Sequence, residues 1–311
     1  MTSMRQPLYL LIGLALLAGC SRSTRQKQNP GSDDGSKTTT EKPAGRVVLQ
    51  NKGSDTLVNV AQAWAEAYKT VNPSIAIAVT GGGSGTGISA LINGTADLAN
   101  SSRSITAKEL DEAKKHGIVP KEHTVGIDAL AVFLHKANPI KEFSREQLAD
   151  IYAEGGKTEK WSQLGVKVPG CDSDEIVRIS RQNNSGTYVY FKEAVLGEGK
   201  EYKFGSRDMH GSKDVVDLVA KTPCAIGYSG LAYATPEVHM PCIKTADGKC
   251  VAPSMKTAVD HSYPIARPLF MYTPGEAKGS VKEYLDWILS DKGQCIIVDK
   301  GYASAKPIKC K

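Results

Sequence analysis

The stretch IAIAVTGGGSGTGISALINGTADLANSSR, residues 75–103, decides the fold that the sequence predicts. Its first residues, 75–79, are apolar, as is typical of a buried strand, and glycines 81–83 end the run. Apolar residues then recur at helical spacing from Ile88 to Ile92. The stretch therefore predicts a strand that passes through a glycine turn into a helix. At such a helix start, unpaired backbone N–H groups and the helix dipole favour an anion.

Other interpretations of this stretch are open. A tight turn capped by Ser84, with no ligand, is one alternative. Residues 85–90 also fit the loose dinucleotide pattern G-x-G-x-x-A, but the acidic residue expected about 20 positions later is poorly supplied. The sequence has no ATP-type phosphate loop, and Ser84 lacks the second glycine of a hydrolase elbow. These patterns give little support to an enzyme.

The N-terminus predicts export. A basic residue, Arg5, precedes a short apolar core, so residues 1–19 are interpreted as a signal peptide. The sequence Leu-Ala-Gly-Cys ending at Cys20 resembles the bacterial lipoprotein cleavage box, which implies cleavage before Cys20 and a lipid on its sulfur. A plain signal peptide is the alternative. Residues 20–45 are polar and lack an apolar period, which predicts a flexible tether.

The charge of the chain argues against nucleic acid as a partner. The formal net charge is +6, and residues 1–45 contribute six basic and three acidic side chains to it. The remainder therefore carries only about +3, which is compatible with a small anionic ligand. Its length is large for one core and comfortable for two α/β lobes.

Apart from Cys20, the chain has six cysteines, an even number that suggests three disulfides in an exported protein. Sequence alone cannot choose among the pairings, but short loops favour Cys242 with Cys250 and Cys295 with Cys310, which leaves Cys171 with Cys224. There is no C-x-x-C motif and the histidines are scattered, so no metal site is predicted.

Two further strands in the first part of the chain lead into polar loops. Residues 47–49 precede Asp55 and Thr56, and residues 97–99 precede Ser101 and Ser102. Open α/β sheets bind ligands at the carboxyl ends of their strands, so these loops and the glycine turn are candidates for one site.

The second part of the chain repeats the pattern with an arginine. Residues 176–181 form a strand that ends at Arg181, whose planar guanidinium suits an oxyanion. Ser185, Gly186 and Thr187 follow and begin a helix. Two apolar runs, 124–135 and 225–229, are predicted to cross between the lobes.

Five motifs together resemble the phosphate-binding proteins of bacterial ABC-type uptake systems. They are GSDT at 53–56, GGGSGTGISAL at 81–91, DLANSSR at 97–103, TVGIDALAV at 124–132 and RQNNSGTYVYF at 181–191. The resemblance covers nearly all of residues 46–311. Their order, their spacing and the lipoprotein-like start carry it, since no single motif is decisive.

The resemblance implies an α/β, two-lobed periplasmic-binding-protein fold of type II-like topology, with hinge strands between the lobes. Lobe I is expected at 46–126 and 260–311, and lobe II at 127–259. The lobes would close on inorganic phosphate. The implied ligand residues are Asp55, Thr56, Ser84, Gly85, Thr86, Arg181, Ser185, Gly186 and Thr187, to which Ser101 and Ser102 are added as hydroxyl donors at a strand end.

One position departs from the family pattern. Family members of the best-known type carry an aspartate where Ser102 aligns, and it accepts a proton from phosphate. Phosphate keeps at least one proton near neutral pH, whereas sulfate keeps none, so a buried carboxylate discriminates between the two. We hypothesise that Asp55 takes this role.

The leading interpretation is an exported lipoprotein, facing the periplasm or cell exterior, that delivers phosphate to the permease and ATPase subunits of an ABC transporter. It would act as a monomer without a cofactor and would not be an enzyme. A binding protein for sulfate or molybdate is the alternative within the fold. An exported nucleotide- or phosphoester-acting enzyme and a structural lipoprotein are alternatives of other classes.

Overall fold

The computed structural model describes residues 46–310, and the structural statements below concern this part of the chain. The predicted signal peptide (1–19), the tether (20–45) and the lipidation site Cys20 lie outside the described residues. Among residues 46–310, no helix is both long enough and apolar enough to cross a membrane.

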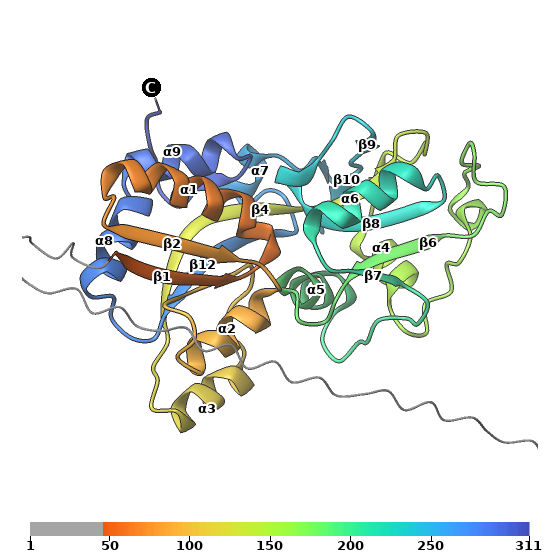
Figure 1. Ribbon diagram of the computed structural model, residues 1–311. Helices are drawn as coiled ribbons and strands as arrows, with labels where there is room; N and C mark the ends of the chain where they lie inside the picture. The colour runs from red at the N-terminus through yellow and green to blue at the C-terminus, as the bar shows by residue number, and fades with distance from the viewer. Residues whose placement is uncertain (1–45, 311) are drawn as a thin grey trace, which may run out of the picture. The chain divides into compact units, whose positions relative to one another are not determined.

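One mixed sheet runs through the described chain in the order β2-β1-β3-β12-β4-β8-β6-β7 (Figure 1). Its first half contains β1 (Val47–Gly53), β2 (Ile75–Thr80), β3 (Leu98–Ser101) and β12 (Ala266–Thr273). Its second half contains β8 (Ala225–Gly230), β6 (Val177–Arg181) and β7 (Arg207–Met209). The long strand β4 (Lys121–His135) joins them. We call the first half with its helices lobe I and the second half with its helices lobe II.

Strand pairing explains how β4 belongs to both lobes. Residues 121–129 of β4 pair antiparallel with β12, and residues 130–134 pair antiparallel with β8. The crossing that was predicted for 124–135 is therefore confirmed. In lobe I, β1 is parallel to β2 and β3, so these three strands end at the same edge. In lobe II, β6 is parallel to β7 and β8.

The second predicted crossing, at residues 225–229, is wrong. These residues form β8, which lies between β4 and β6 inside lobe II. All of β8 is buried because hydrophobic clusters cover both of its faces, and such a central strand is apolar for that reason alone. The chain returns to lobe I instead at the start of β12, where Ala266 pairs with Ala129 of β4.

Helices cover both faces of the lobe I sheet (Figure 1). On one face lie α1 (Val58–Val71), α8 (Gly279–Ile288) and α9 (Asp291–Asp299). On the other lie α2 (Ser84–Ile92) and α3 (Ala107–Lys115). The apolar spacing along α1 buries Trp64 and Tyr68 against the core, and the Trp64 ring N–H donates to the carbonyl of Gly293 at 2.7 Å.

Lobe II has shorter elements. Its helices are α4 (Arg145–Tyr152), α5 (Gly186–Phe191), α6 (Ser212–Lys221) and α7 (Met255–Val259). The predicted capping box of α4 is present, with Ser144 and Gln147 as its partners. A small second sheet contains β5 (Glu142–Phe143), β10 (Cys242–Lys244) and β11 (Cys250–Val251). The short strand β9 (Val238–His239) pairs with residues 134–135 of β4 in lobe II, whereas β13 (Ala303–Ser304) pairs with residues 126–127 of β4 in lobe I.

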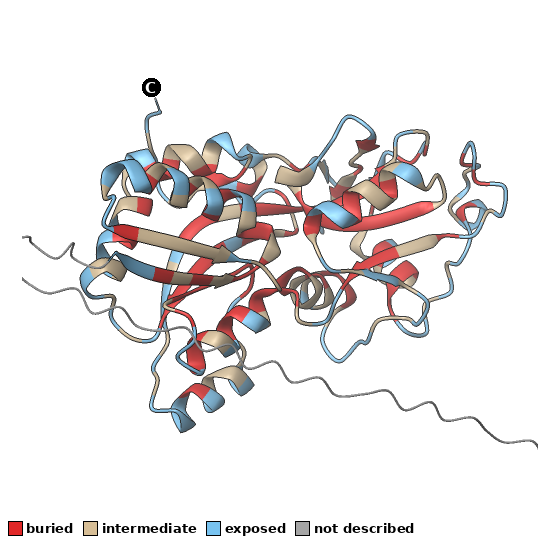
Figure 2. Ribbon diagram, viewed as in Figure 1, coloured by how far each residue is buried: buried red, intermediate tan, exposed pale blue. Residues whose placement is uncertain are grey.

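Each lobe has its own hydrophobic core. One large cluster of buried residues draws its members from 49–125 and 269–302, and another draws them from 129–265. Figure 2 shows the buried strand β4 running between them. Ala232, which follows β8, packs against the lobe I cluster, and the polar groups that join the lobes are described below.

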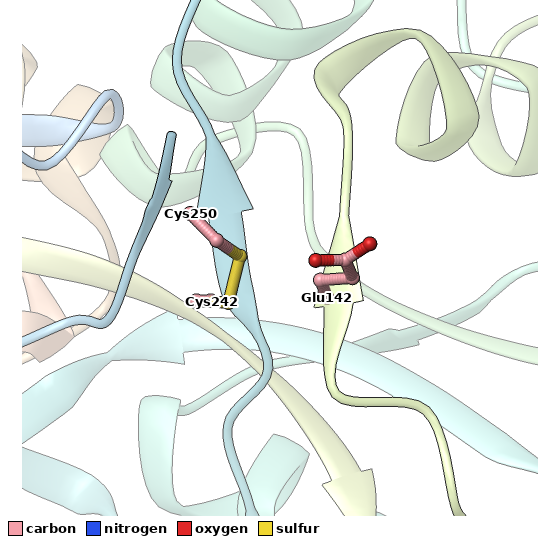
Figure 3. A group of neighbouring side chains, drawn as sticks. All are labelled: Glu142, Cys242 and Cys250. Atoms are coloured by element: carbon pink, nitrogen blue, oxygen red, sulfur yellow. A yellow bond between two sulfur atoms is a disulfide. The ribbon is translucent and has the colours of Figure 1, made fainter. Parts of the chain in front are cut away.

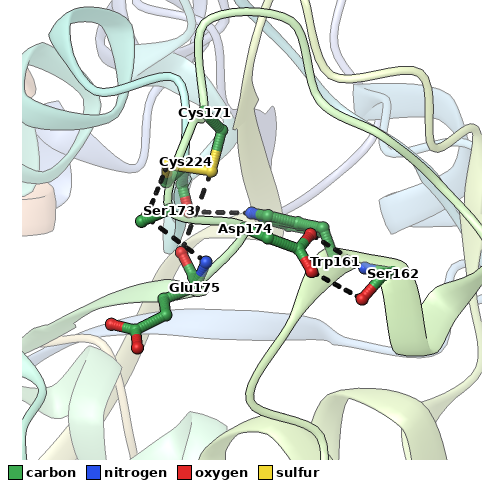
Figure 4. The surroundings of a disulfide bond; sticks show 7 residues. All are labelled: Trp161, Ser162, Cys171, Ser173, Asp174, Glu175 and Cys224. Carbon is green, nitrogen blue, oxygen red and sulfur yellow. Dashed lines mark hydrogen bonds between the residues drawn. A yellow bond between two sulfur atoms is a disulfide. The ribbon is translucent and has the colours of Figure 1, made fainter.

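The three disulfides have the pairing that the loop lengths favoured. Cys171 is bonded to Cys224, Cys242 to Cys250 and Cys295 to Cys310. Around the first of these, the Trp161 ring N–H donates to the carbonyl of Cys224 at 3.1 Å (Figure 4).

Glu142 lies beside the Cys242–Cys250 disulfide (Figure 3), and the three side chains bring potential metal-ligand atoms within 4.8 Å of one another. The two sulfurs are bonded to each other, so neither is the thiolate that a metal requires. The Glu142 carboxylate is paired with Lys244 at 2.7 Å. The arrangement is that of a disulfide next to a surface ion pair.

Candidate functional site

Polar loops from both lobes converge where β1, β2, β3 and β6 end. In lobe I, the three parallel strands share one edge, so the loops that follow them are neighbours. In lobe II, the loop after β6 leads into α5, which Figure 1 shows at the junction of the lobes. The strand-end loops therefore meet, as the strand pattern predicts.

Three serine hydroxyls of lobe I lie at the centre of this region. Ser54 Oγ donates to Ser102 Oγ at 2.9 Å, and the Ser102 backbone N–H donates to Ser84 Oγ at 3.1 Å. Each of these serines is at most 1% exposed. Gly186 of lobe II packs directly on them, since a Cβ built on it would lie 2.3 Å from Ser84 Oγ and 2.7 Å from Ser102 Oγ. This close approach of the lobes requires glycine at position 186.

Two threonines from opposite lobes extend the hydroxyl cluster. Thr56 Oγ1 and Thr187 Oγ1 are 3.1 Å apart, and Nη2 of Arg267 lies 3.3 Å from the first and 3.1 Å from the second. A guanidinium can only donate, so both hydroxyls accept from Arg267 and can turn their own O–H groups elsewhere. Arg267 thereby leaves these hydroxyls free to act as donors.

Arg267 is held by Asp128. Nε and Nη2 of the arginine donate to Oδ2 of Asp128 at 3.1 and 2.9 Å, and Nη1 donates to the carbonyl of Ser102 at 3.1 Å. The two residues lie on β12 and β4, the strands that connect the lobes. Burial raises the pKa of the Asp128 carboxyl, and the charge of Arg267 opposes this shift. Among the described residues, Asp128 Oδ1 has no hydrogen-bond partner.

Arg181 pairs with Asp55 across the lobes. Nη2 of Arg181 donates to Asp55 Oδ2 at 2.9 Å, and the Gly82 N–H donates to Asp55 Oδ1 at 2.8 Å. Arg181 also donates to Ser212 Oγ and to the carbonyls of Met209 and His210. These bonds use all but one of its N–H groups. Burial lowers the pKa of Arg181, and Asp55 offsets part of that shift.

The sequence predicts that Asp55 accepts the proton of a ligand. Both of its oxygens already accept one hydrogen bond from the protein. A carboxylate oxygen can accept a second, so this role stays a hypothesis.

Two predicted residues lie outside the cluster. Ser101 Oγ donates to the carbonyl of Arg103 at 2.6 Å, because successive residues of an extended chain point to opposite sides and Ser102 takes the inward position. Thr86 is exposed, since it lies on the outer side of the first turn of α2, and its hydroxyl accepts from the Asn184 side chain at 3.3 Å.

Two others are close to the cluster but already engaged. The Gly85 N–H donates to the carbonyl of Asn184 at 3.0 Å. Ser185 Oγ accepts from the Thr187 N–H at 3.2 Å and caps α5.

Sequence reasoning missed Arg267 and Asp128. Each lies in an otherwise apolar stretch. Arg267 is near the start of β12, and Asp128 is within the apolar run 124–135 of β4. A charged residue inside an apolar strand needs a partner, and this signal could have identified the pair.

This chain is similar to known proteins over most of its length. The family model described as the PBP superfamily domain matches residues 31–292. The phosphate-binding protein PstS of Pseudomonas aeruginosa is 34% identical over 267 residues, which cover 82% of this chain and 82% of that protein. The chain belongs to the PstS family of phosphate-binding proteins. PstS of Bacillus subtilis is 31% identical over 297 residues, covering 95% of this chain and 92% of that one.

A solved structure shows the same fold. It is a candidate phosphate ABC transporter substrate-binding protein from Clostridium perfringens with bound phosphate, 30% identical, with a TM-score of 0.74. The match covers 83% of this chain and 100% of that chain. The family resemblance and the two-lobed periplasmic-binding fold that the sequence predicted are thereby confirmed.

Proposed function

We propose that this protein captures inorganic phosphate between its two lobes and delivers it to an ABC transporter. One observation carries the proposal: buried hydroxyls from the strand-end loops of both lobes meet beside two arginines. Small hydroxyl groups and arginine N–H groups can surround a tetrahedral oxyanion closely and donate hydrogen bonds to its oxygens. The names of the PstS relatives support phosphate as that anion.

The burial of the cluster favours an anion without a substituent. Thr56, Ser84, Ser102 and Thr187 are each at most 1% exposed. A phosphate enclosed by these residues would leave no open path for an ester group. This enclosure supports inorganic phosphate rather than a phosphate monoester as the ligand.

We assign the ligand contacts to a subset of the predicted residues. The direct donors are the hydroxyls of Thr56, Ser84, Ser102 and Thr187 and the remaining N–H of Arg181. Asp55 accepts the proton of the bound phosphate, and Gly186 allows the close approach of lobe II. Gly85 and Ser185 shape the loops, and Arg267 orients the threonines. Ser101 and Thr86 are not among the phosphate contacts that we propose.

The wider organisation is proposed from the sequence together with the two cores. Residues 46–126 with 260–311 form lobe I and residues 127–259 form lobe II. The separate hydrophobic clusters support a division close to these limits. The signal peptide is cleaved after residue 19. A lipid on Cys20 then anchors the protein to a membrane through the tether 20–45. Outside the cytoplasm, a monomer then meets the permease and ATPase subunits of the transporter. The protein is a carrier and not an enzyme.

Calorimetric titration tests the proposal. The full-length protein would be freed of ligand by unfolding and refolding with its disulfides intact, and titrated with phosphate and, separately, with sulfate. We expect one-to-one binding of phosphate and no heat with sulfate. Binding of sulfate or molybdate alone would retain the fold and overturn the ligand, and silence with every oxyanion from folded protein would overturn the carrier function.

A further inference from the structure

Asn184 lies in the loop between β6 and α5 of lobe II, and all three of its hydrogen bonds between the lobes go to the glycine turn and first helical turn of lobe I. Its carbonyl accepts from the Gly85 N–H at 3.0 Å. Its side-chain Nδ2 donates to the carbonyl of Gly82 at 2.9 Å and to Thr86 Oγ1 at 3.3 Å. These bonds join protein groups directly and need no ligand.

The glycines opposite Asn184 make this contact sterically possible. A Cβ on Gly83 would lie 2.7 Å from the Asn184 carbonyl oxygen, and one on Gly85 would lie 3.3 Å from it. At 2.7 Å a Cβ on Gly83 would clash with the carbonyl oxygen, and at 3.3 Å a Cβ on Gly85 would be closer to it than most Cβ atoms come to a neighbour. Gly83 also has a φ of 91°, which disfavours any side chain. The absence of side chains in the glycine turn therefore lets the lobe II loop approach it closely. This is a use of the glycines separate from anion binding.

Asn184 lies between the buried cluster and solvent. The following residue, Ser185, is 3% exposed, whereas the preceding residue, Asn183, is on the surface. A surface hollow on the outer side is lined by Gln182, Asn183, Asn184, Tyr188 and Asp208. The Asn184 side chain thus closes the rim of the contact between the lobes.

We propose that Asn184 is a latch: it holds lobe II against the glycine turn and thereby slows the release of the captured anion. The inference rests on the proposed function and deepens it. Because the latch bonds form only when the lobes are closed, they stabilise the closed arrangement with or without ligand. The latch therefore acts on opening and dissociation, while the hydroxyls and arginines act on the anion itself.

The variant Asn184→Ala tests the latch, because it removes the two side-chain hydrogen bonds and keeps the backbone. Asn183→Ala is the matched control, since its side chain is exposed and makes no hydrogen bond within the described residues. Each full-length protein would be loaded with radiolabelled phosphate and chased with excess unlabelled phosphate. Two lost hydrogen bonds predict release about tenfold faster in Asn184→Ala, an association rate within about twofold of the unaltered protein, and no change in Asn183→Ala.

Small-angle X-ray scattering of the ligand-free proteins gives a second measurement that does not depend on phosphate. We expect a larger radius of gyration for Asn184→Ala than for Asn183→Ala and the unaltered protein. If the unaltered protein binds no phosphate, the proposed function fails while scattering still decides the latch. Equal radii or an unchanged release rate would overturn the latch. So would a loss of association in Asn184→Ala, because it would make Asn184 a ligand contact.

Discussion

At the scale of single residues, the Asp128–Arg267 pair organises the site. Both side chains are at most 1% exposed, and they lie on the two strands that connect the lobes. Taking two charges out of water is costly, and their mutual hydrogen bonds, together with those from Arg267 to neighbouring oxygens, offset this cost. The geometry gives this pair a use beyond stability, because Arg267 also holds the hydroxyls of Thr56 and Thr187.

Replacing Arg267 by methionine should destabilise the protein by about 3–5 kcal/mol, because Asp128 would stay buried without its partner. The double variant Arg267→Met/Asp128→Leu should recover much of the loss, since no charge is then buried. Urea unfolding measures both. Lys121→Met is the control: Lys121 is half exposed and pairs with Glu276 at 2.8 Å, and surface pairs are worth about 1 kcal/mol or less. Equal losses in the Arg267 and Lys121 variants would contradict the role of the buried pair.

Asp55 should decide between phosphate and sulfate. In Asp55→Asn the carboxylate can no longer repel a fully deprotonated anion, so we expect the preference for phosphate over sulfate to fall at least about tenfold. Asp97→Asn is the control, because Asp97 also accepts a backbone N–H, from Gln50, but lies outside the cluster. Competition calorimetry with both anions makes the comparison. An unaltered preference in Asp55→Asn would leave Asp128 as the acidic group to examine.

Much of the site could be predicted at this scale because its hydroxyls follow strands with a recognisable pattern. Thr56, Ser84, Ser102, Arg181 and Thr187 all come together. Arg267 could not be found in this way, because it does not follow a strand in that pattern. Its partners Thr56 and Thr187 are 211 and 80 positions away in the sequence. Ser101 and Ser102 could not be distinguished either, because the side to which each points depends on where β3 ends.

At the scale of elements, the start of α5 and the start of α2 form a fitted contact. Gly186→Ala should weaken phosphate binding at least about tenfold, because its Cβ would meet Ser84 Oγ at 2.3 Å and keep the lobes from closing. Its effect on unfolding should be small, since lobe cores are untouched. Gly275→Ala is the control, as it has open space and an ordinary backbone conformation. Titration calorimetry and thermal unfolding of both variants check this. Unchanged phosphate affinity in Gly186→Ala would contradict a steric requirement for glycine at this contact.

The disulfides differ in the length of chain they enclose, which predicts a rank order. Cys171–Cys224 spans 53 residues and Cys242–Cys250 spans 8. In the chain-entropy model, replacing both cysteines by serine should cost about 4 kcal/mol for the first bond and about 2.5 kcal/mol for the second. Urea unfolding of the two double variants measures the order, and the reverse order would contradict an entropic origin.

Elements were predicted well where an apolar run met a glycine or a cap, as at β2 and α2. The error at β8 has a physical reason. A strand buried on both faces and a strand that passes between lobes are equally apolar, so residues 225–229 carried no signal that separates them. Only the pairing with β4 and β6 decides.

At the scale of the whole molecule, the lobes have separate cores and meet through polar groups. Arg181–Asp55, Thr56–Thr187 and the Asn184 contacts join them. Polar contacts exchange readily with water, so the closed arrangement, which the Asn184 bonds favour, should be only partly populated without ligand. Scattering should therefore report a smaller radius of gyration with phosphate than without it, and no compaction in Gly186→Ala. Identical radii with and without phosphate would contradict closure as the capture step.

The most direct measurement is a crystal structure of the protein grown with phosphate. We predict one phosphate between the lobes, within hydrogen-bond distance of Thr56, Ser84, Ser102 and Thr187, with Arg181 beside it and no water in contact with it. Phosphate bound elsewhere, or an anion that leaves these hydroxyls bonded only to one another, would contradict it.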